Sequence, residues 1–320
     1  MTFNHYSFQS KILFRNKYIQ TILGSIVSGN TNLPECKLHK VLIDHKAKLA
    51  LFELPSSNPE ATVILLAHGM GGCSDSSYMR RIARKLWIRG FTVFMMNQLG
   101  SGIGMGLSDR LWNGGSSDDL DMTLNYIAKI YPNTAIDVVG FSLSGNILLK
   151  YLGEKVDKIN KIRKAIAVNP PIDLKMTSYF LSKTNWGRMF NNYYMRQVNL
   201  QVEAMAECFS DAFIPPIKST ILEFDEAYTA PVSGYKNSDD YYSTCSAKNY
   251  LDDIDVPTTI LCARDDPFID PSIFKSIRMS NAIELNTPEY GGHMGYLSRK
   301  PTPWGDHRWM DFMIADSVKS

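Results

Sequence analysis

The chain has 320 residues, a length that allows one elaborated domain or two. With 44% hydrophobic and 21% charged residues, its composition is typical of a globular protein with a large core, which excludes disordered, collagenous and disulfide-scaffold proteins. The 34 basic residues nearly balance the 32 acidic ones, giving a formal net charge of +2 without long runs of like charge. This balance indicates no nucleic-acid partner and no obligatory membrane partner, so we expect a small-molecule substrate.

The cysteines are five in number, widely spaced, and form no C-x-x-C pair: Cys36, Cys73, Cys208, Cys245 and Cys262. This pattern argues against a disulfide framework and a zinc site, and it fits a reducing cytoplasm. The N-terminal residues lack a continuous apolar run, so we expect no secretory signal. The charge-free stretches 18–34 and 91–108 are interrupted by polar residues and glycine and are not expected to span a bilayer. The predicted location is therefore cytoplasmic, while no pattern predicts the oligomeric state.

Apolar runs alternate with amphipathic helical patterns from about residue 38 onward. This order predicts a mostly parallel sheet with helices on both faces, in one α/β domain over residues 1–320. The expected strands cover residues 39–43, 49–54, 62–67, 91–96, 136–139, 165–169, 258–263 and 282–285. Apolar residues recurring every three or four positions predict two helices. The first covers residues 77–89, and the second begins after Ser116 or Ser117 as its N-cap and continues to residue 130.

Residues 171–256 separate the sixth and seventh predicted strands and far exceed the usual connection of about 2 to 6 residues. The segment contains 14 of the 36 aromatic residues of the chain. We expect it to form a helical cap that closes an apolar pocket. The alternative is a small helical core of its own that binds no ligand.

The segment Gly140–Gly145 (GFSLSG) joins the predicted strand 136–139 to a helical run. A strand, a sharp turn and a helix in this order predict a nucleophile elbow with Ser142 as the nucleophile. Residues two before and two after the nucleophile must be small, because the neighbouring helix and strand leave no room. Gly140 meets this condition, whereas Ser144 stands where glycine is usual. Taking Ser144 as the nucleophile fits worse, and a serine-rich turn without chemistry is the other alternative.

The sequence His68–Gly72 (HGMGG) follows the predicted strand 62–67. A glycine-rich turn after this strand is where an oxyanion hole is built, and the expected donors are the backbone N–H groups of Met70 and Leu143. The alternative is an ordinary glycine-rich turn. His68 is expected to be a structural hydrogen-bonding residue of the loop.

Asp265 and Asp266 follow the strand 258–263, and His293 lies in a glycine-rich loop after the last strand. Together with Ser142 they give the chain order serine, acid, histidine of the catalytic triad in α/β-hydrolases. Only one of the two adjacent carboxylates can point toward His293. The G-x-x-D-x-x-[IV] spacing of such hydrolases, met here by residues 263–269, favours Asp266.

These motifs resemble the YheT-like subfamily of α/β-hydrolases over nearly the whole chain. The similar segments are 16–21 (NKYIQT), 140–154, 239–243 (DDYYS), 265–268 and 291–295. The resemblance implies a serine hydrolase that acts on carboxylic esters with apolar acyl groups. Three positions depart from the family pattern: Ser144 replaces glycine, Leu99 replaces arginine and Asn113 replaces histidine. A substrate preference mediated by that arginine or histidine is therefore not carried over.

In the predicted mechanism, His293 takes the proton of Ser142 as the serine attacks an ester, and Asp266 fixes the histidine tautomer. The amides of Met70 and Leu143 stabilise the oxyanion, and water releases the acyl group. This chemistry requires no metal and no organic cofactor. The alternatives are an acyltransferase or thioesterase with the same triad, and a hydrolase-fold binding protein without turnover.

Overall fold

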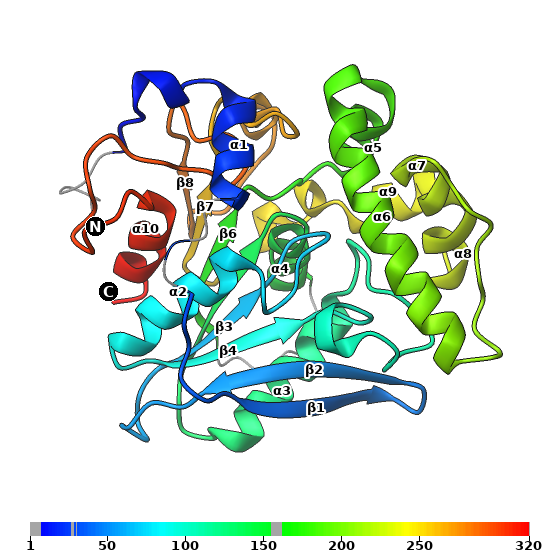
Figure 1. The fold of residues 1–320 in the computed structure, drawn as a ribbon, viewed down its shortest axis with the longest axis horizontal. Coiled ribbons are helices and arrows are strands. Elements are labelled where there is room, and N and C mark those ends of the chain that lie inside the picture. The colour runs from blue at the N-terminus through cyan, green and yellow to red at the C-terminus, as the bar shows by residue number, and fades with distance from the viewer. Residues whose placement is uncertain (1–7, 27–28, 30, 155–161, 320) are drawn as a thin grey trace.

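The computed structural model describes residues 8–26, 29, 31–154 and 162–319. An eight-stranded sheet in the order β1-β2-β4-β3-β5-β6-β7-β8 runs through the molecule (Figure 1). β2 is antiparallel to both of its neighbours, and the strands from β4 to β8 are parallel. The central strands are buried along their whole length, as expected for a parallel sheet covered on both faces.

All eight predicted strands are present, and the chain order matches the prediction. Their bounds are β1 Lys37–Asp44, β2 Ala47–Leu54, β3 Val63–Ala67, β4 Thr92–Asn97, β5 Ile136–Phe141, β6 Ile162–Val168, β7 Thr258–Leu261 and β8 Ile283–Asn286. The strand ends differ from the predicted ones because apolar runs mark the buried middle of a strand and not its termini. β5, for example, continues to Phe141, the residue directly before Ser142.

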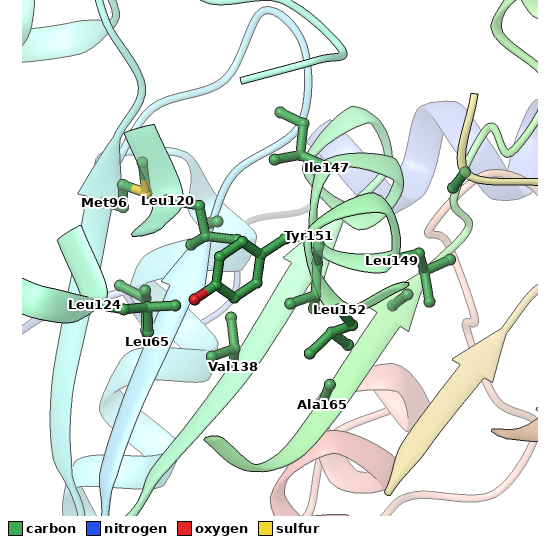
Figure 2. Close-up of a cluster of buried hydrophobic side chains, with 14 of the residues drawn as sticks. Leu65, Met96, Leu120, Leu124, Val138, Ile147, Leu149, Tyr151, Leu152 and Ala165 are labelled. Carbon is green, nitrogen blue, oxygen red and sulfur yellow. The ribbon is translucent and has the colours of Figure 1, made fainter. Parts of the chain in front are cut away.

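Helices cover both faces of the sheet. α3 (Ser117–Ile130) and α4 (Leu143–Gly153) pack on one face, and α2 (Ser77–Ile88) and α10 (Trp309–Ser317) on the other. Figure 2 shows the first interface, where side chains of α3 and α4 meet those of the central strands: Leu120, Leu124, Ile147, Tyr151 and Leu152 against Leu65, Met96, Val138 and Ala165. Each such buried side chain contributes roughly 1.5–3 kcal/mol, so this packing fixes the start of α4 relative to β5.

The predicted N-cap of α3 is confirmed at Ser116, although it caps the helix without its side chain. Ser116 is the N-cap residue, but its side chain makes no cap hydrogen bond. Its hydroxyl accepts a hydrogen bond from the N–H of Asn113 instead, at 3.1 Å, because the chain before the helix turns back on itself. The first turn of α3 carries the exposed Asp118, whose charge interacts favourably with the helix dipole, and the buried Asp119.

Five α-helices lie between β6 and β7: α5 (Leu174–Lys183), α6 (Asn185–Cys208), α7 (Ile221–Phe224), α8 (Ala230–Val232) and α9 (Ser238–Cys245). A π-helical turn, Asp225–Thr229, joins α7 to α8. In Figure 1 these helices gather beside one end of the sheet. Some aromatic residues of the segment, such as Phe224 and Tyr228, pack with α6 in a core of their own.

A helix that the sequence patterns did not predict, α1 (Lys17–Ile26), lies near the N-terminus. It packs against the loop that follows β8, as the close approach of Gly24 to Gly295 shows: a Cβ added to Gly24 would lie 2.6 Å from the Gly295 Cα. No helix in the described part of the chain is long and apolar enough to cross a membrane.

Candidate active site

Ser142 occupies the sharp turn between β5 and α4. Its backbone has φ 49° and ψ −117°, a conformation that non-glycine residues rarely adopt and that is found at strained functional turns. The turn is tight because β5 and α4 nearly touch: a Cβ added at Gly140 would lie 2.5 Å from the Ser144 carbonyl oxygen. Any larger residue at position 140 would therefore push the helix away from the strand.

His293 lies between Ser142 and Asp266. Its Nε2 is 2.8 Å from the Ser142 Oγ, and its Nδ1 is 2.8 Å from Asp266 Oδ2. Both His293 and Asp266 are buried, at 8% and 7% exposure. The structure thus brings together three predicted residues that are 151 and 27 positions apart in the sequence.

The Asp266 carboxylate is held by four hydrogen bonds. Oδ1 accepts from the N–H groups of Phe268 (2.7 Å) and Ile269 (3.2 Å). Oδ2 accepts from His293 Nδ1 and from Asn169 Nδ2, the latter at 2.6 Å. Asn169 was missed in the sequence; it directly follows β6 with a φ of 47°, and its Oδ1 accepts from the Tyr296 hydroxyl at 2.9 Å. An asparagine directly after a buried strand was the available signal.

Asp265 points elsewhere. Its Oδ1 accepts a hydrogen bond from the Gly292 N–H at 2.8 Å, and burial raises the pKa of its carboxyl to about 6. It has no hydrogen bond to His293. The two adjacent carboxylates therefore have different contacts, one to the imidazole and one to the backbone of the same loop.

The glycine-rich loop after β3 passes directly over Ser142. A Cβ at Gly69 would lie 3.0 Å from the Ser142 Cβ, so only glycine fits there without displacement. The Gly69 N–H donates to the Tyr78 hydroxyl at 3.0 Å, a contact that fixes the loop from α2. Within the described residues the N–H groups of Met70 and Leu143 have no hydrogen-bond acceptor, and both residues line the cavity that contains Ser142.

His68 is a structural residue, as predicted. Its Nδ1 donates to the Gly69 carbonyl (2.8 Å), and its Nε2 accepts from the Gln98 N–H (3.1 Å). Burial lowers its pKa to about 4, which keeps the imidazole neutral near pH 7. Ser144 belongs to the same group: its hydroxyl donates to the His68 carbonyl and accepts from Gln98 Nε2 at 3.0 Å. A serine is tolerated here because its added hydroxyl is fully paired.

The other two departures from the family pattern lie in different settings. Leu99 is buried in the core with α3 and α4. Asn113 lines the cavity, where its Nδ2 donates to the Ser233 hydroxyl at 2.9 Å. Only the second of these positions is therefore placed to contact a substrate.

A cavity of about 80 Å3 extends from Ser142 and His293 under helices α5 to α9. Most of its wall is apolar and comes from those helices: Leu174, Leu181, Val198, Ile221 and Phe224, with Phe268 from the acid loop. Three aromatic residues of the segment also line it, namely Tyr194, Tyr241 and Tyr242. Part of the aromatic-rich segment therefore packs in a core of its own, and part of it lines the cavity.

The loop that carries His293 is anchored by α1. Thr21 Oγ1 accepts from the His293 N–H, and Gln20 Oε1 accepts from the Leu297 N–H, both at 2.9 Å. Both α1 side chains are buried. Both residues lie in the segment 16–21, whose resemblance to the family was the available signal for this role. No group of three or more potential metal ligands occurs within the described residues.

Comparison with known proteins finds relatives among the α/β-hydrolases. A family model described as the alpha/beta hydrolase fold matches residues 62–216. The chain is 26% identical to the protein YheT of Escherichia coli over 310 residues, which are 94% of this chain and 91% of YheT. It is 30% identical to the monoacylglycerol lipase of Saccharomyces cerevisiae over 256 residues, which are 76% of this chain but only 56% of that lipase. A medium-chain fatty acid ethyl ester synthase/esterase of the same yeast is 27% identical, and 61% of its length is covered.

Solved structures show the same fold at low sequence identity. The esterase Pf2001 of Pyrococcus furiosus superimposes with a TM-score of 0.57 at 18% identity, covering 89% of both chains. A serine hydrolase of Cycloclasticus zankles gives a TM-score of 0.55 at 13% identity, covering 89% of this chain and 98% of that one. These likenesses confirm the predicted fold class.

Proposed function

Because the chain is a YheT-like α/β-hydrolase, we propose that it is a carboxylic ester hydrolase with Ser142 as its nucleophile. The observation that carries this proposal is the line of two hydrogen bonds from Ser142 through His293 to Asp266. A hydroxyl, an imidazole and a carboxylate in this order are the parts of a serine hydrolase triad. Two yeast relatives, the monoacylglycerol lipase and the ester synthase/esterase, are named as enzymes that act on esters, which agrees with the proposal.

In this mechanism, His293 Nε2 removes the proton from Ser142 Oγ while the oxygen attacks the ester carbonyl carbon. Asp266 accepts the Nδ1–H of the imidazole and so fixes the tautomer and stabilises the imidazolium. The N–H groups of Met70 and Leu143 donate to the oxyanion of the tetrahedral intermediate. The alcohol leaves with the proton from His293, and water then attacks the acyl-enzyme with His293 as the base. Every step uses groups of the chain, the ester and water.

The substrate side of the proposal rests on the cavity wall. Leu174, Leu181 and Val198 offer an apolar surface to the group bound beside Ser142. Each methylene buried there contributes about 0.8 kcal/mol, which favours apolar acyl chains. We take residues 171–256 as a cap inserted into one hydrolase domain, since the helices of this segment supply most of that surface.

The decisive experiment is labelling of the purified protein with a fluorophosphonate, together with hydrolysis of p-nitrophenyl butyrate. Wild type should be labelled, and Ser142→Ala should lose both labelling and about 10⁴-fold or more of kcat. Ser144→Ala, which removes the hydroxyl two positions away, serves as the matched control and should still be labelled. Residual activity of Ser142→Ala within tenfold of wild type would exclude Ser142 as the nucleophile. An unlabelled but ester-binding wild type would indicate a binding protein.

Acyl transfer to an alcohol is a second candidate, because one yeast relative is named as an ester synthase as well as an esterase. The same acyl-enzyme would then react with an alcohol instead of water. Hydrolysis in the presence of ethanol separates the two cases: the ratio of ethyl ester to free acid, compared with the concentrations of ethanol and water, shows whether the enzyme prefers the alcohol.

A further inference from the structure

A single carboxylate lies among the described residues that line the mostly apolar cavity. Asp225 is the first residue of the π-helical turn Asp225–Thr229 and is 8% exposed. It lines the same cavity as Ser142 and His293. No lysine or arginine is among the described residues that line this cavity, so the carboxylate has no basic partner there. Short π-helical turns are frequent at functional sites, which makes this carboxylate a candidate for ligand recognition.

The carboxylate keeps room for a further hydrogen bond. Oδ1 accepts from the Thr229 hydroxyl at 2.7 Å, and Oδ2 accepts from the Tyr242 hydroxyl at 2.8 Å. A carboxylate oxygen accepts two hydrogen bonds, so each oxygen has one position left. Burial raises the pKa of Asp225 to about 6, although the hydrogen bonds from Thr229 and Tyr242 oppose this rise.

Asp225 lies beyond the residues next to the nucleophile. Leu143, which follows Ser142, packs against a cluster that contains Leu174, Tyr241 and Tyr242. The hydroxyl of Tyr242 in turn contacts Asp225. Asp225 is therefore linked to the residue after Ser142 through Tyr242 and lines the same cavity, so a substrate that fills the cavity reaches Asp225 with atoms remote from its ester group.

We propose that Asp225 recognises a hydroxyl group on the substrate, several bonds from the ester carbonyl. This inference rests on the proposed function and narrows its substrate class from apolar esters to esters with an apolar chain and a remote hydroxyl. A hydroxyl fits better than an ammonium group because Tyr241 also lines the cavity, and its hydroxyl accepts from the Gly114 N–H at 2.8 Å, which leaves its own proton available to donate. That proton is able to bond the oxygen of a bound hydroxyl, whereas an ammonium has no lone pair to accept such a bond.

The test compares p-nitrophenyl esters of equal chain length that end in a methyl, a hydroxyl or an ammonium group. Three proteins are measured: wild type, Asp225→Asn, and the control Asp239→Asn, which removes an exposed carboxylate from α9. In wild type the hydroxyl ester of the best length should have the highest kcat/KM. Asp225→Asn should lower the hydroxyl-to-methyl ratio by about tenfold to a hundredfold, the usual range for a hydrogen bond to a charged group. Asp239→Asn should leave this ratio unchanged.

An unchanged ratio in folded Asp225→Asn, or a preference of wild type for the ammonium ester, would overturn the assignment. If Asp225→Asn does not fold, Asp225→Glu gives the second test. Glutamate keeps the charge but places the carboxylate one methylene further into the cavity. The hydroxyl ester with the highest kcat/KM should therefore become one carbon shorter, while the best chain length among the methyl esters should not change.

A binding measurement separates failure of this inference from failure of the proposed function. Isothermal titration calorimetry with 1-hexanol and with hexyl methyl ether requires no turnover. Wild type should bind the alcohol more tightly than the ether, and Asp225→Asn should reduce that difference by about tenfold or more. If the fluorophosphonate does not label Ser142, the esterase proposal fails, yet this titration still decides whether Asp225 binds a hydroxyl.

Discussion

The hydroxyl oxygen of Thr21 accepts a hydrogen bond from the backbone N–H of His293 at 2.9 Å, joining residues 272 positions apart. The same hydroxyl donates to the Lys17 carbonyl within α1, which fixes its orientation. The first turns of α1 thereby hold the loop that carries the proposed catalytic base. Thr21 touches neither Ser142 nor the cavity, so it acts through the position of His293.

Thr21→Val should therefore lower kcat by about tenfold to a hundredfold with a much smaller change in KM, because a displacement of about 1 Å in a catalytic group costs rates of this order. Valine keeps the shape of threonine but leaves the buried N–H of His293 without an acceptor. Thr21→Ser retains the hydroxyl and should restore most of kcat. A variant that loses thermal stability but keeps the kcat of wild type would show that Thr21 is only a packing residue.

The sequence was sufficient to predict the elements whose signal is local. Apolar runs located all eight strands, and the glycine flanking Ser142 marked the elbow, because a helix and a strand in contact exclude a side chain there. Spacing alone also favoured Asp266, the carboxylate that contacts His293 in the structure.

The supporting residues could not be predicted in the same way. Asn169, Tyr78 and Thr21 lie far from the triad in the sequence, and each acts through a contact that exists only after folding. Asp225 was missed for a related reason. A carboxylate in a helical segment reads as a solvated residue unless the cavity it faces is known.

Asp266→Asn should lower kcat by roughly 10³ to 10⁴, because the imidazole of His293 loses the carboxylate that fixes its tautomer. Asp265→Asn should cost much less, since an asparagine Oδ1 still accepts from the Gly292 N–H. The two variants are matched in charge and position, so their ranking isolates the contact to His293. Steady-state kinetics on variants with native circular dichroism spectra measure this ranking. The reverse ranking would assign the orientation of His293 to Asp265.

Acyl chain length should raise kcat/KM stepwise from acetate until the cavity is full. Each added methylene that contacts Leu181, Val198 or Phe224 contributes about 0.8 kcal/mol, or roughly a fourfold gain. A series of p-nitrophenyl esters measures this directly. A strict preference for acetate would mean that the apolar wall belongs to the core of the cap and does not contact the acyl group.

Ser144→Ala should destabilise the folded protein by about 1–3 kcal/mol, because it leaves Gln98 Nε2 and the His68 carbonyl without their buried partner. Urea unfolding measures this change. A double-mutant cycle with Gln98→Leu should show a coupling of about 0.5–3 kcal/mol, since each variant removes the same hydrogen bond. Additive effects of the two substitutions would show that the contact contributes nothing to stability.

Asp119 predicts a pH dependence of stability. Burial raises the pKa of this carboxyl from 3.8 to about 6 in the folded protein, although Arg110 lies 4.0 Å away. Between these two values the folded state binds the proton more tightly than the unfolded state, so the free energy of unfolding falls as pH rises from about 4 to 6. Above pH 6 the buried charge of Asp119 lowers the free energy of unfolding by its full amount, roughly 1–3 kcal/mol.

Asp119→Asn has no proton to lose at this position and should therefore be more stable than wild type at pH 8, by a margin that shrinks toward pH 4. Urea unfolding of both proteins at several pH values measures that margin, because other titrating groups cancel in the difference. Asp118→Asn, which removes an exposed carboxylate from the same helical turn, controls for the change in net charge. A margin for Asp119→Asn that is constant from pH 4 to pH 8 would mean that burial does not penalise this charge.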